Sequence, residues 1–364
     1  MKIASLLFVA FGLLAGLSRA QPSAPDLTGL PAYHPQSEVT GLIRNFGCPF
    51  SGLMTAWEDG FRRYQPKARF ADRLPSSDAA ISGLVTGVAD LAPNGREPMF
   101  AEYLAFQETL GYDLSQVTIA TGAFDIKGRT WAIAIFVNKD NPITQLTMKQ
   151  LDGVFGSERT GAYRGFKWYP QYGRGAKDNI RTWGQLGLTG AWADKEIHTY
   201  GYAFTGMTNY FQLAVFNGGD KWNPNYREYA EMGTKLVSPG PIGESGSIAH
   251  MLKELSEDKY GIAWTGIPHV RAFPQYGLKP LALAPREGGP YFAPTLENVR
   301  SRMYPLTRSI FMQYGRPPGQ PLEPKEREFL RYILSRQGQE DVVRNGQYLP
   351  LTAAAAAEEL QKLD

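Results

Sequence analysis

Apolar and polar positions along the chain follow two spacings in turn, one typical of strands and one typical of helices. Residues 39–46 form an apolar strand pattern, residues 47–52 form a turn with two glycines and a proline, and residues 53–64 carry apolar side chains at helical spacing. The same order repeats along the next residues, with strands at 68–74 and 88–92 and helices at 79–86 and 98–110. Strands that alternate with helices predict an α/β fold with mixed, mostly parallel sheets.

The second half of the chain continues the two spacings but contains one long stretch without either. Strands are predicted at 130–137, 260–265, 280–284 and 304–314, and helices at 146–151, 208–216, 247–255, 324–337 and 353–363. Thr147 is expected to cap the first of these helices. Residues 157–179 are rich in glycine, tyrosine and basic residues, so they predict a long surface loop.

The first twenty residues have a pattern of their own. Lys2 precedes an almost wholly apolar run at 3–17, and Ser18, Arg19 and Ala20 then provide a small-x-small cleavage pattern. These features predict a secretory signal peptide that is cleaved after Ala20, and therefore an exported, periplasmic protein. The apolar run is too short to span a bilayer comfortably, and no cysteine follows the cleavage site to carry a lipid anchor.

Composition narrows the possible classes of function. Loss of Lys2 and Arg19 with the signal peptide lowers the formal net charge from +3 to about +1, and the chain has no basic tract of the kind that binds nucleic acid. The hydrophobic fraction of 43% excludes disorder, and a mature chain of roughly 340 residues is long enough for two domains. Cys48 is the single cysteine, so no internal disulfide can form and the core must supply the stability.

The sequence lacks the motifs that catalysis requires. No two of the four histidines stand at metal-ligand spacing: His34, His198, His250 and His269. Phosphate loops and dinucleotide glycine patterns are absent, and residues 243–247 resemble a nucleophile elbow but lack its second glycine. We therefore expect a protein that is not an enzyme and that needs no cofactor and no metal. A secreted hydrolase that uses Ser245 or Ser77 is the alternative, although neither serine has a recognisable histidine partner.

A recurrent feature is a short turn of small or hydroxyl residues after a strand and before a helix. Such a turn presents free backbone N–H groups and the positive end of the helix dipole, which together bind anions without a formal charge. Several such turns at the carboxyl ends of strands in one α/β chain predict a ligand site. The candidate ligand-binding residues are Phe50, Ser51, Ser76, Ser77, Asn94, Gly95, Arg96, Thr205, Gly206, Met207 and Thr208.

Several segments also carry the motifs of a known family. Residues 304–308 read YPLTR, residues 328–339 read EFLRYILSRQGQ, and residues 346–351 read GQYLPL. Residues 141–156 (NPITQLTMKQLDGVFG) and 261–264 (GIAW) match two further motifs. In this order and spacing, nearly the whole mature chain resembles the phosphate-binding, PstS-like family of periplasmic solute-binding proteins of ABC transporters.

The resemblance implies the two-lobed type II periplasmic binding protein fold, in which crossover strands join the lobes and the ligand lies between them. It also implies that a monomer captures phosphate or a related oxyanion and delivers it to an ABC permease in the membrane. The segments expected on this basis are a signal peptide at 1–20, a leader at 21–37, the first part of lobe 1 at 38–130, lobe 2 at 131–270, a return to lobe 1 at 271–351 and a helical tail at 352–364.

One part of the family's ligand site is altered in this chain. In the family, turns after the first three strands and an Arg-x-x-x-Ser-Gly-Thr helix start in the other lobe hold the oxyanion, and the first three candidate turns fall on those positions. At the fourth position residues 205–207 read TGM, and Gly201 stands where the phosphate-coordinating arginine would be. Loss of a bidentate guanidinium removes a strong oxyanion contact, and Arg96 is the candidate to replace it. A family member that binds a different small ligand or acts as a sensor is the alternative.

Overall fold

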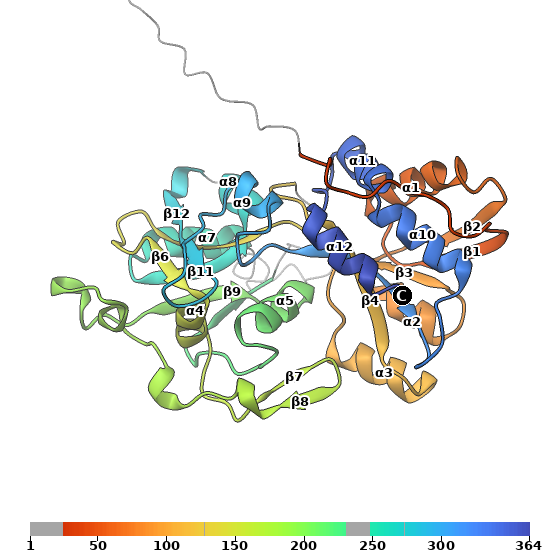
Figure 1. Ribbon diagram of the computed structural model, residues 1–364. Coiled ribbons are helices and arrows are strands. Elements are labelled where there is room, and N and C mark those ends of the chain that lie inside the picture. Colours follow the sequence, from red (N-terminus) through yellow and green to blue (C-terminus); the bar gives the residue numbers. More distant parts are fainter. Residues whose placement is uncertain (1–24, 127, 231–247, 273) are drawn as a thin grey trace, which may run out of the picture.

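The computed structural model describes residues 25–126, 128–230, 248–272 and 274–364. Each of two five-stranded sheets forms the centre of one lobe, and the two lobes lie side by side (Figure 1). The expected signal peptide at 1–20 and the elbow-like segment at 243–247 lie outside the described residues. No helix within the described ranges is long and apolar enough to cross a membrane.

The sheet of the first lobe has the strand order β2-β1-β3-β14-β4. Its strands are β1 (Gly41–Phe46), β2 (Ala68–Arg73), β3 (Leu91–Asn94), β4 (Leu114–Thr121) and β14 (Ser309–Gly315). β1 pairs in parallel with β2 and β3, whereas β14 pairs antiparallel with β3 and β4. The predicted mixed sheet is confirmed, but the expectation that it is mostly parallel is wrong. Parallel and antiparallel pairings are equally frequent because β14 enters from the other lobe and runs against its neighbours.

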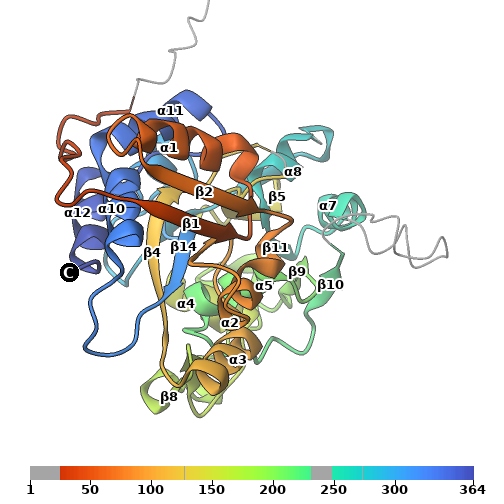
Figure 2. The same ribbon diagram turned by 90° about the vertical axis from the view of Figure 1, so that its right-hand side faces the viewer.

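Helices cover both faces of this sheet, as Figure 2 shows. One face carries α1 (Leu53–Arg62), α10 (Pro324–Leu334), α11 (Arg336–Asn345) and α12 (Ala353–Gln361), and the other carries α2 (Ala80–Val85) and α3 (Phe100–Leu110). Trp57, Phe61 and Phe329 are completely buried in the core under the first face, and Phe106 is completely buried under the second. Burial of these rings holds the strands in place, because large buried aromatic side chains contribute most of the apolar area in a core.

The second lobe repeats the arrangement with the strand order β10-β9-β11-β5-β12. Its strands are β5 (Ile133–Asn138), β9 (His198–Tyr202), β10 (Arg227–Tyr229), β11 (Gly261–Gly266) and β12 (Leu278–Pro280), and its helices are α4 (Met148–Phe155), α5 (Gly206–Val215), α7 (Ile248–Glu257), α8 (Ile267–Ala272) and α9 (Leu296–Arg300). β9 is parallel to β10 and β11, and β5 is antiparallel to β11 and β12. The β6 (Gln145–Thr147) and β13 (Ala282–Ala284) strands form a separate pair.

The chain returns to the first lobe later than the sequence predicted. Residues 271–351 were expected in lobe 1, but β12 pairs with β5 of the second lobe, and Leu283, Tyr304 and Leu306 are buried in the core of that lobe. The return begins at β14, and the first residues of the predicted strand at 304–314 are not strand. The apolar pattern of a short strand does not state which sheet it joins, so the sequence alone placed this boundary wrongly.

Two other predicted segments differ in detail. The expected loop at 157–179 contains a hairpin of β7 (Ala162–Arg164) and β8 (Lys167–Tyr169). The helix predicted at 324–337 ends at Ser335, whose side chain accepts a hydrogen bond from the Gly338 N–H and so caps α11. A cap inside an amphipathic stretch divides it into two helices without disturbing the apolar spacing.

The two connections between the lobes lie against each other. The N–H of Gly122, which follows β4, donates to the carbonyl oxygen of Arg308, which precedes β14, at 2.9 Å. A Cβ atom at position 122 would lie 2.3 Å from the carbonyl oxygen of Thr130 in the same connection and 3.2 Å from that of Arg308 in the other. Only glycine therefore allows the two connections to approach this closely, which places Arg308 at the junction of the lobes.

A buried carboxyl in the first lobe, Glu58, makes the stability of the protein depend on pH. Burial, together with the neighbouring carboxyl of Asp72, raises the pKa of Glu58 from 4.5 to about 8. Because the folded pKa exceeds the unfolded one, the folded protein binds this proton more tightly, and stability falls as the pH rises from about 4.5 through 8. We expect the melting temperature of Glu58→Gln to fall less between pH 5 and pH 8 than that of the wild type, as thermal unfolding followed by circular dichroism will show.

The matched control for this measurement is Asp59→Asn on the same helix. The Asp59 side chain is exposed, so its replacement should leave the pH dependence of the wild type unchanged. Parallel melting-temperature curves for the wild type and Glu58→Gln would show that this carboxyl titrates at its ordinary pKa.

Candidate functional site

The strand directions bring the predicted turns to one edge of the first sheet. β1, β2 and β3 are parallel, so the turns that follow them share an edge. β14 runs the other way, and Phe311 near its start pairs with Asn94 at the end of β3. Arg308 directly precedes β14, so it lies at the same edge of the sheet. More than 200 positions separate it from the end of β3 in the sequence.

The first turn is strained and tightly held. Phe50 and Ser51 both have positive φ, 46° and 55°, a conformation that costs non-glycine residues about 1–2 kcal/mol each. The Phe50 ring is buried, with its centroid 5.7 Å from that of Tyr348, and the carbonyl oxygen of Ser51 accepts a hydrogen bond from Asn345 at 3.1 Å. Strain that the surrounding structure maintains in this way is typical of ligand-binding backbone.

The second and third turns meet at Gly95. The Gly95 N–H donates to the hydroxyl oxygen of Ser77 at 3.0 Å, and the Thr130 hydroxyl donates to the Gly95 carbonyl oxygen at 2.8 Å. A Cβ atom at position 95 would lie 3.0 Å from the Thr130 oxygen and 3.8 Å from the Phe50 ring. The structure thus brings Phe50, Ser77 and Gly95 together, whereas Ser76 is exposed and makes no side-chain cap hydrogen bond.

Asn94 is held inside the first lobe. It is completely buried, its amide donates to the Gln313 side chain at 3.0 Å, and its own oxygen accepts from the Arg96 N–H at 3.1 Å. These bonds fix the backbone of the third turn and leave the amide of Asn94 directed along the sheet. Asn94 therefore supports the shape of the turn.

Arg96 is fully engaged with protein acceptors. Its Nε and Nη2 donate to Asp78, its two terminal nitrogens donate to the carboxylate of Glu102 at 2.8 Å, and Nη1 also donates to the Glu97 carbonyl oxygen. A guanidinium has five N–H donors, and these contacts use all of them. This geometry does not support the expectation that Arg96 replaces the missing guanidinium contact to an anion, because no N–H is left for one while the contacts hold.

The fourth turn comes from the second lobe and touches the first. The Thr205 hydroxyl accepts from the N–H groups of Met207 and Thr208 and so caps α5, while the Thr208 hydroxyl donates to a carbonyl oxygen of the same lobe. A Cβ atom at Gly206 would lie 2.5 Å from the Arg96 side chain, so the lobes are in contact here. The side chain of Met207 is buried and offers no hydroxyl to a ligand.

The place of the family's arginine is filled by aromatic side chains. A Cβ atom at Gly201 would lie 2.2 Å from Nε1 of Trp264 and 2.3 Å from the hydroxyl oxygen of Tyr226. These two groups are hydrogen-bonded to each other at 3.0 Å, and both rings pack in the second core. Position 201 therefore has no room for an arginine, and the missing contact cannot be restored there.

A further candidate binding residue, which the sequence did not reveal, is Arg308. It is only 5% exposed, and within the described residues its Nε has no hydrogen-bond partner and its guanidinium forms no salt bridge. The guanidinium lies over the ring of Tyr210 in the second lobe, 5.4 Å from the centroid. A buried, unpaired guanidinium costs several kcal/mol unless an anion binds to it. The signal in the sequence was the YPLTR motif, which marked the family but not the role of its last residue.

Glu97 lies close to Arg308 and is also unsatisfied. Its Oε2 atom is buried and has no partner among the described residues. Burial raises the pKa of this carboxyl above its ordinary value, although the charges of Arg308 and Arg96 act in the opposite direction. The site therefore offers both a free donor and a free acceptor. Across the described part of the chain, no group of three or more His, Cys, Asp or Glu side chains could hold a metal ion.

Known proteins resemble the chain over nearly its whole length. Phosphate-binding protein PstS from two strains of Pseudomonas aeruginosa is 32% identical over 363 residues, which cover 99% of this chain and 98% of theirs. No family model matches the chain.

Solved structures are similar at lower identity. PstS from Borrelia burgdorferi is 14% identical, with 85% of this chain and 99% of that chain covered and a TM-score of 0.49. An ABC-type phosphate transport receptor from Vibrio cholerae is 19% identical, with 85% and 100% covered and a TM-score of 0.48. On the identity and coverage shared with the Pseudomonas aeruginosa proteins, the chain belongs to the PstS family of solute-binding proteins.

Proposed function

We propose that the chain is an exported solute-binding protein that captures phosphate between its two lobes and delivers it to an ABC importer. The observation that carries the proposal is the buried, unpaired Nε of Arg308 at the junction of the lobes. The strained turn at Phe50 and Ser51 and the hydroxyl of Ser77 lie at the same edge of the first sheet. The curated relatives are named for phosphate binding, which supports the same ligand.

The chemistry of the two unsatisfied groups favours phosphate over sulfate. Arg308 needs an acceptor, and Glu97 Oε2 needs a donor. Hydrogen phosphate carries unprotonated oxygens for the guanidinium and a hydroxyl for the carboxylate, so it satisfies both groups at once. Burial raises the pKa of Glu97, and hydrogen phosphate satisfies this carboxyl in either protonation state, whereas sulfate, which has no proton at neutral pH, satisfies only the protonated form. Phosphate is therefore the ligand that the site accommodates without leaving a buried group unpaired.

The proposal includes a monomer that acts in the periplasm without catalysing a reaction. Its support is the leader pattern of the first twenty residues and the transport role named for similar proteins. The alternative function, a secreted hydrolase, has no support at Ser77. The Ser77 hydroxyl accepts a hydrogen bond from the Gly95 N–H and is hydrogen-bonded to no histidine among the described residues. Ser245, the other candidate nucleophile, lies outside those residues.

A ligand panel tests the proposal directly. We expect phosphate to raise the melting temperature of the mature chain in a saturable way, because a ligand at 1,000 times its Kd stabilises the folded state by about 4 kcal/mol. Sulfate, molybdate and small organic acids at the same concentration should produce a much smaller shift. Differential scanning fluorimetry with titration calorimetry on the positive ligands measures this. If phosphate left the melting temperature unchanged, the proposal would be wrong, and a family member that binds another ligand or acts as a sensor would be favoured.

A further inference from the structure

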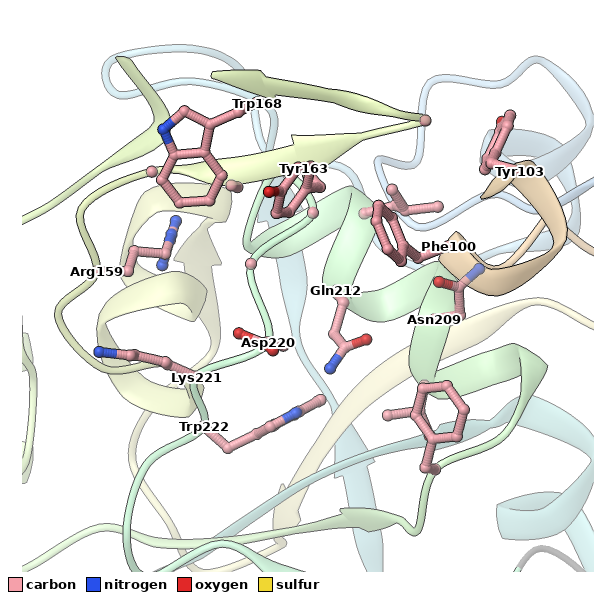
Figure 3. A pocket seen from close by; sticks show the side chains of 18 of the residues that line it. Phe100, Tyr103, Arg159, Tyr163, Trp168, Asn209, Gln212, Asp220, Lys221 and Trp222 are labelled. Carbon is pink, nitrogen blue, oxygen red and sulfur yellow. The ribbon is translucent and has the colours of Figure 1, made fainter. Parts of the chain in front are cut away.

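A pocket lies between the lobes beside the anion site, and Thr208 of the fourth turn is part of its lining. It has a volume of about 750 Å³ and is open to solvent, between α3 of the first lobe and the β7–β8 hairpin and α5 of the second (Figure 3). Phe100 and Tyr103 line it from the first lobe, and Gln212 is among the residues that line it from the second. A site of this size falls within the roughly 300–1,000 Å³ that small-molecule pockets occupy.

The walls of the pocket carry aromatic rings that remain exposed. Phe204, Tyr163 and Trp168 are 65%, 46% and 42% exposed, although large aromatic side chains are normally buried. Trp168 rests on Gly161, where a Cβ atom would lie 2.4 Å from the indole, and its centroid is 5.0 Å from that of Tyr163. These contacts hold the indole in place, so its outer face is a fixed apolar platform. A cluster of exposed aromatic rings rimmed by polar groups is typical of a binding site.

The polar groups of the pocket are free to bind a ligand. In the view of Figure 3, Gln212 and Asp220 point into the middle of the pocket. Neither side chain makes a hydrogen bond or a salt bridge within the described residues, so the pocket offers an amide donor, an amide acceptor and a carboxylate. The mixed set suits a ligand whose groups both donate and accept, as hydroxyl groups do.

The charges of the pocket exclude a second oxyanion. Arg159 is part of the lining, but its guanidinium binds the buried carboxylate of Asp152 through both oxygens. The remaining charged groups are Asp220, Glu228 and Lys221, which together are slightly negative. Without a free arginine, the pocket is suited to a neutral ligand.

We propose that this pocket is a second binding site that takes a neutral carbohydrate of one or two rings. The C–H face of a sugar ring packs on an aromatic platform such as Trp168, and the hydroxyl groups at its rim bond to the amide of Gln212 and the carboxylate of Asp220. Aromatic planes with amide and carboxylate side chains beside them provide the apolar contact and the paired hydrogen bonds that a polyol requires. Neither Arg308 nor Glu97 lines this pocket.

Sugar binding by the mature chain tests the proposal, with and without phosphate. The probes are glucose, N-acetylglucosamine, maltose and diacetylchitobiose, followed by saturation-transfer NMR and by tryptophan fluorescence. We expect saturable binding of at least one sugar, weakened about tenfold or more in Trp168→Ala and in Gln212→Ala, with an unchanged response to phosphate. Tyr291→Ala, an exposed ring outside the lining, is the matched control and should bind as the wild type does.

Two results would overturn the proposal. One is the absence of saturable binding of every sugar up to about 20 mM, a range in which even weak sites become occupied. The other is binding that is equal in the wild type, Trp168→Ala and Gln212→Ala, which would place the sugar elsewhere on the surface. Melting curves of both variants show whether they fold. Gly161→Val is an independent test, because its side chain displaces the Trp168 indole without removing the tryptophan.

Discussion

Arg308→Met should weaken phosphate binding by about 100-fold or more while leaving the unliganded protein at least as stable as the wild type. Charge-assisted hydrogen bonds contribute about 1.5–3 kcal/mol each, and a guanidinium makes two of them to one oxyanion. Without ligand, the side chain of Arg308 is buried and its Nε has no partner among the described residues, so methionine removes the cost of a buried charge, which exceeds the loss of the guanidinium contact with the Tyr210 ring. Titration calorimetry and denaturant unfolding measure the two effects separately.

Arg96→Met is the matched control, because it removes a second buried guanidinium from the same edge of the sheet. Arg96 is bonded to Asp78 and Glu102, so its loss should lower the free energy of unfolding by about 1–3 kcal/mol. Its effect on phosphate affinity should be smaller than that of Arg308→Met. If Arg96→Met weakened phosphate binding more than Arg308→Met does, the contact to the anion would have to be assigned to Arg96.

Gly201→Arg should unfold or strongly destabilise the second lobe and should not improve phosphate binding. Even a methyl group at this position would lie within 2.3 Å of both Trp264 and Tyr226. Overpacking of a close-packed core costs about 1–3 kcal/mol, and an unpaired charge beside it adds several more. We expect a loss of at least about 4 kcal/mol, visible in denaturant unfolding followed by tryptophan fluorescence.

A second arginine substitution separates this packing effect from the added charge. Gly175 is exposed, and a Cβ atom there would meet nothing closer than a Lys177 carbon at 3.9 Å. Gly175→Arg should therefore change the stability by no more than about 0.5 kcal/mol. A Gly201→Arg protein that folds as well as Gly175→Arg and binds phosphate more tightly would show that position 201 still belongs to the ligand site.

Local pattern was sufficient for most elements and for the family. The apolar spacing placed α1, α5 and α12 within a few residues of their bounds, and the prediction that Thr147 caps α4 is confirmed by its hydrogen bond from the Gln150 N–H at 3.1 Å. The YPLTR and GQYLPL motifs indicated the family through their order and spacing with the other motifs of the chain. Such features depend on neighbours in the chain, so a sequence reports them directly.

The candidate site was only partly accessible to the same reasoning. Phe50, Ser77 and Gly95 were predicted because each follows its own strand, and the structure brings them together. Nothing local revealed that the donors of Arg96 are occupied by Asp78 and Glu102, because that network forms between a turn, a helix start and a helix. Binding by these residues stays a prediction until the ligand panel is measured.

The sequence by itself determined the leader pattern, the alternation of strands and helices, and the family to which the chain belongs. Only the tertiary structure decided where the charge of the site comes from. Arg308 reaches the edge beside Asn94 because β14 returns from the second lobe and pairs antiparallel with β3. Gly201 lies against Trp264 because β9 and β11 are neighbours in one sheet. Both facts depend on pairing between distant segments, which apolar spacing along the chain does not encode.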